Sequence, residues 1–229
     1  SGARIRDDGG AATALSGEAE VRGRVAEGEV VTVRGTIDDG GASGEAAEIE
    51  VHHSVEGEVE AKGPGEVVVS GTRISVDDAT AVADRHGNPL SMDDVPAGER
   101  IEVSGHGDGR GGLHATAVRV SDQPAGSERE LRGFVVAVSG SIVDLSFTPG
   151  GAVAVRVDVG SVSPAPALAV GMSVEVRTSG PADANGVFTA TAVHAEDDLA
   201  PEAGDEVEVE GIVTAVDASG GAIGSPPGA

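Results

Sequence analysis

Histidine, aspartate and serine are the residues of this sequence whose types suit metal binding or catalysis. The histidines are His52, His53, His86, His106, His114 and His194. A zinc site needs three or four converging ligands, often with characteristic local spacing. His52 and His53 are adjacent, and on a strand adjacent side chains point to opposite faces. The spacing of the histidines therefore predicts no transition-metal site.

Pairs of adjacent aspartates recur along the chain, at Asp38-Asp39, Asp77-Asp78, Asp93-Asp94 and Asp197-Asp198. Carboxylates in loops are the usual ligands of calcium. The segment "DANG" from Asp183 resembles the start of a calcium loop, but the downstream bidentate glutamate is missing at the proper spacing. The pairs favour soluble turns, with calcium bound in one or more loops as the alternative, and we expect no other cofactor.

Motifs of catalysis and nucleotide binding are absent from the sequence. There is no Gly-x-Ser-x-Gly elbow, no phosphate-binding Gly-x-x-x-x-Gly-Lys-Ser/Thr and no dinucleotide fingerprint after a strand. Carbohydrate clefts are lined with aromatic side chains, and this chain has three Phe, no Trp and no Tyr. We therefore expect a protein that is not an enzyme.

The composition indicates an all-β protein. Of 229 residues, 39% are hydrophobic, mostly Val, Ala, Leu and Ile, and 36 Gly and 11 Pro punctuate the chain. Branched side chains favour half-buried sheet surfaces, and frequent Gly and Pro indicate many short strands joined by turns.

The formal charge is −24, from 39 acidic and 15 basic residues, and Lys62 is the sole lysine. Nucleic-acid binding needs a basic surface, because most of its affinity comes from neutralising phosphates. We therefore expect no nucleic-acid partner. The absence of cysteine excludes disulfides and thiolate sites. No apolar run is long enough to span a membrane, and the first residues are not a signal peptide.

Three motifs recur in a fixed order. The first is "VRGRV" at Val21, "VEGEV" at Val55, "LRGFV" at Leu131 and "VEGIV" at Val209. The second is "GEVVTVRG" at Gly28, "GERIEVSG" at Gly98 and "GMSVEVRTSG" at Gly171. The third is "GEAAEIEVHHS" at Gly44, "GLHATAVRVSD" at Gly112 and "GVFTATAVHAED" at Gly186. Such self-similarity is typical of a tandem array.

The motifs divide the chain into modules. We predict a tail (1–19), a partial unit (20–54), a complete unit (55–122), a linker (123–130), a second complete unit (131–197), a linker (198–205), and a partial unit with a Gly/Pro-rich tail (206–229). Each complete unit reads as five strands with a long connection before the fourth, which is the plan of a small OB-like barrel. We expect tandem barrels whose interiors hold Val103, Val118, Val120, Val174, Val176 and Val193. Gly57 and Gly133 are expected to let the first strand bend.

The pattern from "VEGEV" through "VDDAT", "VPAGERIEVSG" and "GGLHATAVRV" resembles the bacterial tandem repeat module of the DUF5666 family, a domain of unknown function. The second unit resembles it through "LRGFVVAV", "ALAVGMSVEV" and "GVFTATAVHA", and departs from it where "VRVDVGS" replaces the "VDDAT" stretch. The resemblance implies an OB-like barrel, a tandem arrangement and export to the cell surface or the extracellular space, and it implies no activity.

The two partial ends are complementary. Residues 26–54 resemble the last two strands of a unit, and residues 206–224 resemble its first strand or two. The chain could be a fragment of a longer array, its N-terminal segment could be a degenerate cap, or the ends could complete each other between molecules. The third alternative predicts head-to-tail self-association, in a filament or surface layer. The residues expected at this contact are Val207, Val209, Ile212, Val213, Val31, Val33, Ile49 and Val51.

We thus expect an exported structural or assembly protein that associates with itself or with another surface protein. The alternative is an extracellular binding module that recognises a cation, a glycan or a partner protein through its loop tips.

Overall fold

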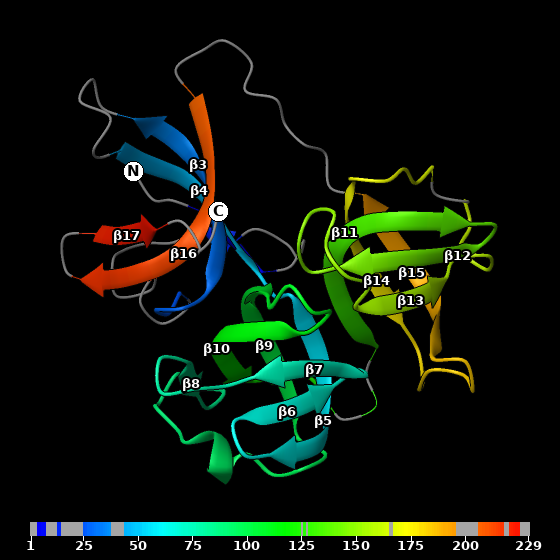
Figure 1. Cartoon of the computed structure of the whole chain (residues 1–229). Coiled ribbons are helices and arrows are strands. Elements are labelled where there is room, and N and C mark those ends of the chain that lie inside the picture. The colour runs from blue at the N-terminus through cyan, green and yellow to red at the C-terminus, as the bar shows by residue number, and fades with distance from the viewer. Residues whose placement is uncertain are drawn as a thin grey trace. The chain divides into compact units, whose positions relative to one another are not determined.

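The computed structural model describes residues 4–7, 13–14, 25–37, 44–124, 126, 128–164, 167–195, 206–217 and 220–224. These residues form strands and one short 3-10 helix, η1 (Met92–Asp94) (Figure 1). The chain divides into two compact units, one of His53–Asp198 and one that combines Ser1–His52 with Leu199–Ala229. The all-β prediction is confirmed.

A closed five-stranded barrel occupies the first half of the unit His53–Asp198. Its strands are β5 (Val55–Gly63), β6 (Glu66–Val69), β7 (Thr72–Ser75), β9 (Arg100–Gly107) and β10 (Leu113–Val120), and β8 (Ala81–Ala83) adds to β10 from outside. The antiparallel pairs β5–β6, β6–β7, β10–β9 and β9–β5 and the parallel pair β7–β10 close the ring. The barrel is therefore mixed, with its one parallel pair between the third and fifth strands of the ring.

The second half of this unit repeats the same order of pairings. Its strands are β11 (Arg129–Ser139), β12 (Ile142–Ser146), β13 (Val155–Asp158), β14 (Ser173–Thr178) and β15 (Val187–Ala195). The pairs β11–β12, β12–β13, β14–β15 and β11–β14 are antiparallel, and β13 lies parallel to β15. We call the two sets of strands the first ring and the second ring.

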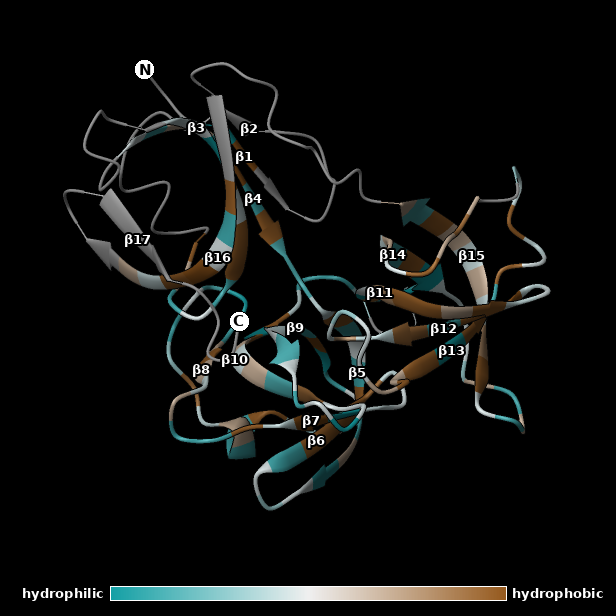
Figure 2. Ribbon diagram, turned by 45° about the horizontal axis from the view of Figure 1, so that its top comes forward, coloured by the Kyte–Doolittle hydropathy of each residue, from teal (hydrophilic) through white to brown (hydrophobic). Residues whose placement is uncertain are grey.

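One hydrophobic cluster, mostly of valine, runs through both rings. Hydrophobic residues lie along the strands, and hydrophilic ones are frequent in the turns (Figure 2). Of the predicted interior positions, Val103, Val118, Val120, Val174 and Val176 are buried, which confirms the expected register. Val193 is half-buried against the same cluster.

The first strand of each ring bends slightly later than expected. The register shifts fall between Val59 and Ala61 in β5 and between Val135 and Ala137 in β11, beyond Gly57 and Gly133. Glycine is needed at 133 for a different reason, since a Cβ there would lie 2.8 Å from the carbonyl oxygen of Ser146.

The other unit is a sheet that joins both ends of the chain. Its strands are β1 (Arg4–Asp7), β2 (Thr13–Ala14), β3 (Val30–Ile37), β4 (Gly44–His52), β16 (Glu206–Asp217) and β17 (Gly220–Gly224), in the order β17-β16-β3-β4-β1-β2. Its core includes Ile5, Val25, Val31, Val51 and Val213. We call this sheet the terminal sheet.

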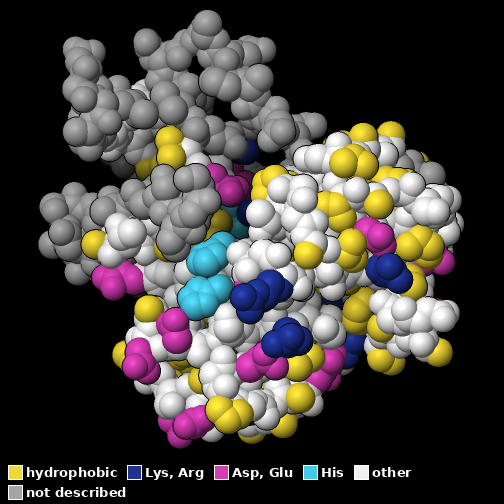
Figure 3. All heavy atoms as spheres, in the orientation of Figure 1, with side chains coloured by type: hydrophobic (Ala, Val, Ile, Leu, Met, Phe, Trp, Pro, Cys, Tyr) yellow, Lys and Arg dark blue, Asp and Glu magenta, His cyan; other side chains and the backbone are white. Residues whose placement is uncertain are grey.

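On the face shown in Figure 3, the side chains of Lys and Arg lie among those of Asp and Glu. None of the helical residues that the structure describes forms a span with the length and hydrophobicity needed to cross a bilayer.

Candidate functional site

The terminal sheet is the candidate site, because it brings together the N-terminal and C-terminal segments that were expected to take part in self-association. Strand β16 pairs antiparallel with β3 from Glu206↔Thr36 to Ile212↔Val30. The segment resembling a first strand thus lies beside the segment resembling a fourth strand, as β5 lies beside β9 in the first ring.

A β-bulge marks the first strand of all three sets of strands at the same motif position. The register shifts after Val59 in β5, after Val135 in β11 and after Val213 in β16. Each of these valines ends the motif apolar-x-Gly-x-Val. Strand β16 therefore shares with β5 and β11 a bulge at the end of the same motif.

The same valines make a repeated pair of backbone hydrogen bonds. Val59 donates to Glu99 O at 2.9 Å, and Gly98 N donates to Val59 O at 2.9 Å. Val135 has the same two bonds with Met172 and Gly171, at 2.9 and 2.8 Å. In the terminal sheet, Val213 donates to Glu29 O at 2.9 Å, and Gly28 N donates to Val213 O at 2.8 Å.

The second motif begins with glycine because its first residue has a positive φ. Gly28, Gly98 and Gly171 have φ values of 89°, 83° and 95°. This left-handed region is costly for residues with a Cβ. The second motif therefore turns the chain into the fourth strand in the same way at all three places, and at Gly28 its partner comes from the other end of the chain.

The hairpin of the last two strands also recurs. Gly35 in β3 and Gly105 in β9 pair with Ala46 and Ala115, respectively. A Cβ on either glycine would collide with a carbonyl oxygen of the facing strand, that of Glu45 or of His114. Strand β1 lies parallel to β4, with Ile5 beside Ile49. In the first ring, β8 lies parallel to β10 at the equivalent position, with Val82 beside Val118.

The structure places the residues expected at the self-association contact in this one sheet. Val31, Val51 and Val213 are buried, Val33, Ile49 and Ile212 are half-buried, and Val209 is 41% exposed. Val207 lies opposite Gly35, and its side chain is outside the described set. The pairing is within one chain, and the same pairing between two chains stays a prediction.

The six histidines lie on several strands and turns of the two units. His52 is buried in the terminal sheet with its Nε2 2.9 Å from Thr32 Oγ1, and His53 belongs to the other unit, 3.8 Å from Glu102. His106 and His114 are cross-strand partners with ring centroids 5.2 Å apart. Within the described part of the chain, no group of three or more His, Asp or Glu side chains is arranged to hold a metal ion.

The aspartates of several turns bind their own backbone. Asp183 Oδ1 accepts N–H bonds from Asn185 and Val187 at 2.8 and 2.9 Å, and Asp108 Oδ1 accepts them from Arg110 and Gly112 at 2.7 and 2.9 Å. The N–H of Val187, followed by that of Asn185, lowers the pKa of Asp183. Burial raises the pKa of Asp108, but its two N–H donors and the charges of Arg110 and Arg73 together hold it below its ordinary value.

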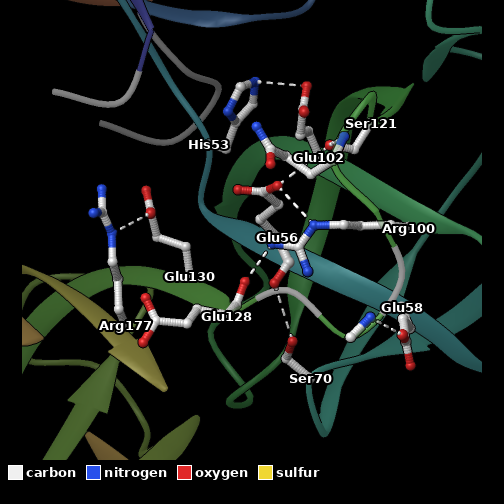
Figure 4. Close-up of polar contacts among 12 residues, drawn as sticks. His53, Glu56, Glu58, Ser70, Arg100, Glu102, Ser121, Glu128, Glu130 and Arg177 are labelled. Carbon is white, nitrogen blue, oxygen red and sulfur yellow. Dashed lines mark hydrogen bonds and ion pairs between the residues drawn. The ribbon is translucent and has the colours of Figure 1, made fainter. Parts of the chain in front are cut away.

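The sequence did not predict the joint between the two rings (Figure 4). The start of β5 pairs antiparallel with the start of β11, through Val55↔Leu131 and Glu56↔Glu130. Arg132 N donates to Ser54 O at 3.0 Å, which extends the pairing by one residue. Val55 and Leu131 are buried, with exposures of 0% and 1%.

The joint brings two glutamates opposite each other, and each has an arginine. Arg100 Nε donates to Glu56 Oε1 at 3.0 Å, and Arg177 Nε donates to Glu130 Oε2 at 2.9 Å. Partial burial lowers the pKa of Arg177, but its bond to Glu130 and the charges of Glu130, Glu175 and Glu128 together raise it above its ordinary value. Arg100 also donates to the carbonyl of Glu128, and Ser121 Oγ donates to Glu56 Oε1 at 3.3 Å. Each of these two ion pairs lies within one ring. The rings are connected by the strand pairing, by the bond from Arg100 to the Glu128 carbonyl and by the ion pair of Arg129 with Glu60 at 3.4 Å.

Comparison with known proteins gives a family for the first ring. Residues 56–119 match the family model described as Domain of unknown function (DUF5666). This confirms the resemblance for those residues, and the closed five-stranded barrel is a DUF5666 domain. No curated protein and no solved structure matches the chain.

Proposed function

We propose that this protein, which carries a DUF5666 domain, is a non-enzymatic scaffold built of tandem β modules that assembles by strand exchange at its two ends. The observation that carries this proposal is the pairing of β16 with β3 from Glu206↔Thr36 to Ile212↔Val30. Two ends far apart in the chain meet there in the register of a module.

The chain, in this proposal, is an array of three modules of one kind. Support comes from the second ring, whose strand pairings follow the order of the first. The terminal sheet adds the same bulge and the same hydrogen bonds, at Val213 and Gly28. The two rings are then tandem barrels, and the third module is divided between the chain ends.

A module divided in this way can close in two ways. Strand β16 can pair with β3 of its own chain or, in the same register, with β3 of a second copy, because the backbone and side-chain contacts are identical. Closure within the chain benefits from a high effective concentration, whereas exchange between chains needs a high protein concentration. Exchange is head-to-tail, so it gives rings or open filaments according to the rotation between subunits.

The composition fits an exported surface scaffold. The chain is acidic and has no cysteine, and such a protein stays soluble and needs no redox control in an extracellular setting. A binding module that acts through its loop tips is the alternative function, and it would act as a monomer.

Engineered disulfides test strand exchange directly, because the chain has no cysteine of its own. Val30 and Ile212 are Cα partners across β3 and β16. The double variant Val30→Cys/Ile212→Cys is unfolded, refolded at low or high concentration and then oxidised. We expect an intrachain disulfide at low concentration and a ladder of covalent oligomers at high concentration.

The matched controls are the single variants, which can form no product larger than a dimer. Intrachain disulfide alone at every concentration would contradict strand exchange while leaving the closed terminal sheet intact.

A further inference from the structure

The joint between the two rings has a hidden symmetry. Val55 and Leu131 begin the same motif, apolar-x-Gly-x-Val, in the first and second rings. They are partners in the joint, so each residue pairs with its own counterpart. A strand pair of this kind is isologous: both partners present the same patch, related by a local two-fold axis.

The terminal sheet carries another copy of this motif at Val209, the first residue of "VEGIV". On one side Val209 pairs with Val33 of β3, as Val55 pairs with Val103 of β9. Among the described strands, β17 pairs with β16 only from Ile212 onward. Val209 is 41% exposed, whereas its counterparts in the joint are buried.

We infer that Val209 is the centre of a two-fold contact between two copies of this chain. In this dimer, β16 of each copy pairs antiparallel with β16 of the other, Val209 against Val209, as Val55 lies against Leu131 inside one chain. The contact buries two exposed valines and repeats a joint that the same motif already makes.

The charges of the patch set the strength of this dimer. The two-fold register places Glu208 of each copy opposite Glu210 of the other, and like charges directly opposite on a sheet are destabilising. Within the chain, the equivalent Glu56↔Glu130 pair has Arg100 and Arg177 beside it.

Of the two motif positions that hold these arginines, the terminal sheet has arginine at one. The register puts Arg34 across from Glu208, as Arg177 lies across from Glu130. Val30 stands at the motif position of Arg100. We therefore expect a weak dimer that salt strengthens, because salt screens the two like-charged pairs.

The first test is sedimentation equilibrium of the whole chain with Val209→Glu, which places two further carboxylates against each other. We expect this variant to remain monomeric at concentrations where the unchanged chain forms dimers. The matched control is Val170→Glu, at a valine that is 66% exposed, and this variant should dimerise like the unchanged chain. Equal dimerisation of Val209→Glu and the unchanged chain would overturn the inference.

A second variant strengthens the contact, so the test does not depend on loss alone. Glu210→Arg replaces the two like-charged pairs by two opposite-charge pairs, in which Glu208 of each copy faces the introduced arginine of the other. We expect the dimer dissociation constant to fall on the order of tenfold at low salt and its salt dependence to reverse. An unchanged dissociation constant would contradict the two-fold register.

The dimer is also separable from strand exchange. In Val30→Cys/Ile212→Cys with its intrachain disulfide closed, exchange is blocked, but the edge at Val209 is unchanged. We expect this locked chain to form dimers and nothing larger. A locked chain that is monomeric wherever the unlocked chain forms dimers would assign the dimer to strand exchange and overturn the two-fold contact.

Discussion

At the scale of single residues, one polar side chain binds several backbone groups of a connection. Lys62, the sole lysine, donates from Nζ to the carbonyl oxygens of Met92, Asp93 and Val95 at 2.8, 3.2 and 2.7 Å. The lysine therefore ties the end of β5 to the connection that precedes β9. Val138 stands at the same motif position in the second ring and is 44% exposed.

Replacing Lys62 by Met should lower the free energy of unfolding by about 1 kcal/mol, because three carbonyls lose a charged donor at a partly solvated site. Urea unfolding measures this change. The control is Arg73→Met, which removes an exposed ion pair with Glu66 and should cost less. A Lys62→Met variant as stable as the original would show that the connection needs no such tie.

Turn aspartates should make the stability of the protein depend on acid pH. Backbone donors hold the pKa of Asp183 below its ordinary value. The pKa of Asp84 is also lowered, and the largest cause is the hydrogen bond from the side chain of Asn88. A lowered pKa in the folded state stabilises the fold at pH values above the pKa of the unfolded chain. This stabilisation is lost as the pH falls through the lowered value, below about pH 4.

The variant Asp84→Asn/Asp108→Asn/Asp183→Asn should therefore melt below the unchanged protein at pH 7, and the difference should shrink toward about pH 3. Melting temperatures across this range measure it. A difference that is constant with pH would mean that the loops gain nothing from the carboxylate charge.

At the scale of elements, the alternation of apolar and polar residues and the repeated motifs predicted the strands and their buried faces better than any single motif could. Val174 and Val176 alternate with Ser173, Glu175 and Arg177, and the structure buries both valines in β14. The bulges follow the last valine of a repeated motif, but the motif alone does not say that a register shift occurs there. The joint at Val55 was not predictable, because pairing partners depend on which backbone edges meet in three dimensions. The sequence predicted that the strands of the two ends are complementary. It did not predict that they pair in one chain, since a sequence does not say whether strands pair within or between chains.

The register of β14 has a direct stability test. Val176 is 1% exposed and pairs with both Leu131 and Val193. Val176→Ala should lower the free energy of unfolding by about 1–3 kcal/mol, because it leaves a cavity in a packed core. Val170→Ala, at an exposed position, should be nearly neutral. A loss of less than about 0.5 kcal/mol at Val176 would contradict its buried position.

At the scale of the whole molecule, the net charge of −24 should make the stability depend on salt. Its self-repulsion should fall as salt shortens the Debye length below about 8 Å, so the melting temperature should rise with sodium chloride. Calcium chloride of equal ionic strength should raise it further if acidic loops bind the ion. Superimposable curves in the two salts would remove calcium as a ligand, and a melting temperature independent of salt would contradict the charge argument.

The central claim is that residues 206–224 complete a module begun by residues 25–52. Amide hydrogen exchange on the full chain and on a chain lacking 206–229 tests it most directly. We predict that the shortened chain loses protection across Val30–Ile37, while the strands from Val55 to Ala195 keep theirs. Unchanged protection of Val30–Ile37 would contradict the claim, because β3 would then hold its structure without its partner from the other end.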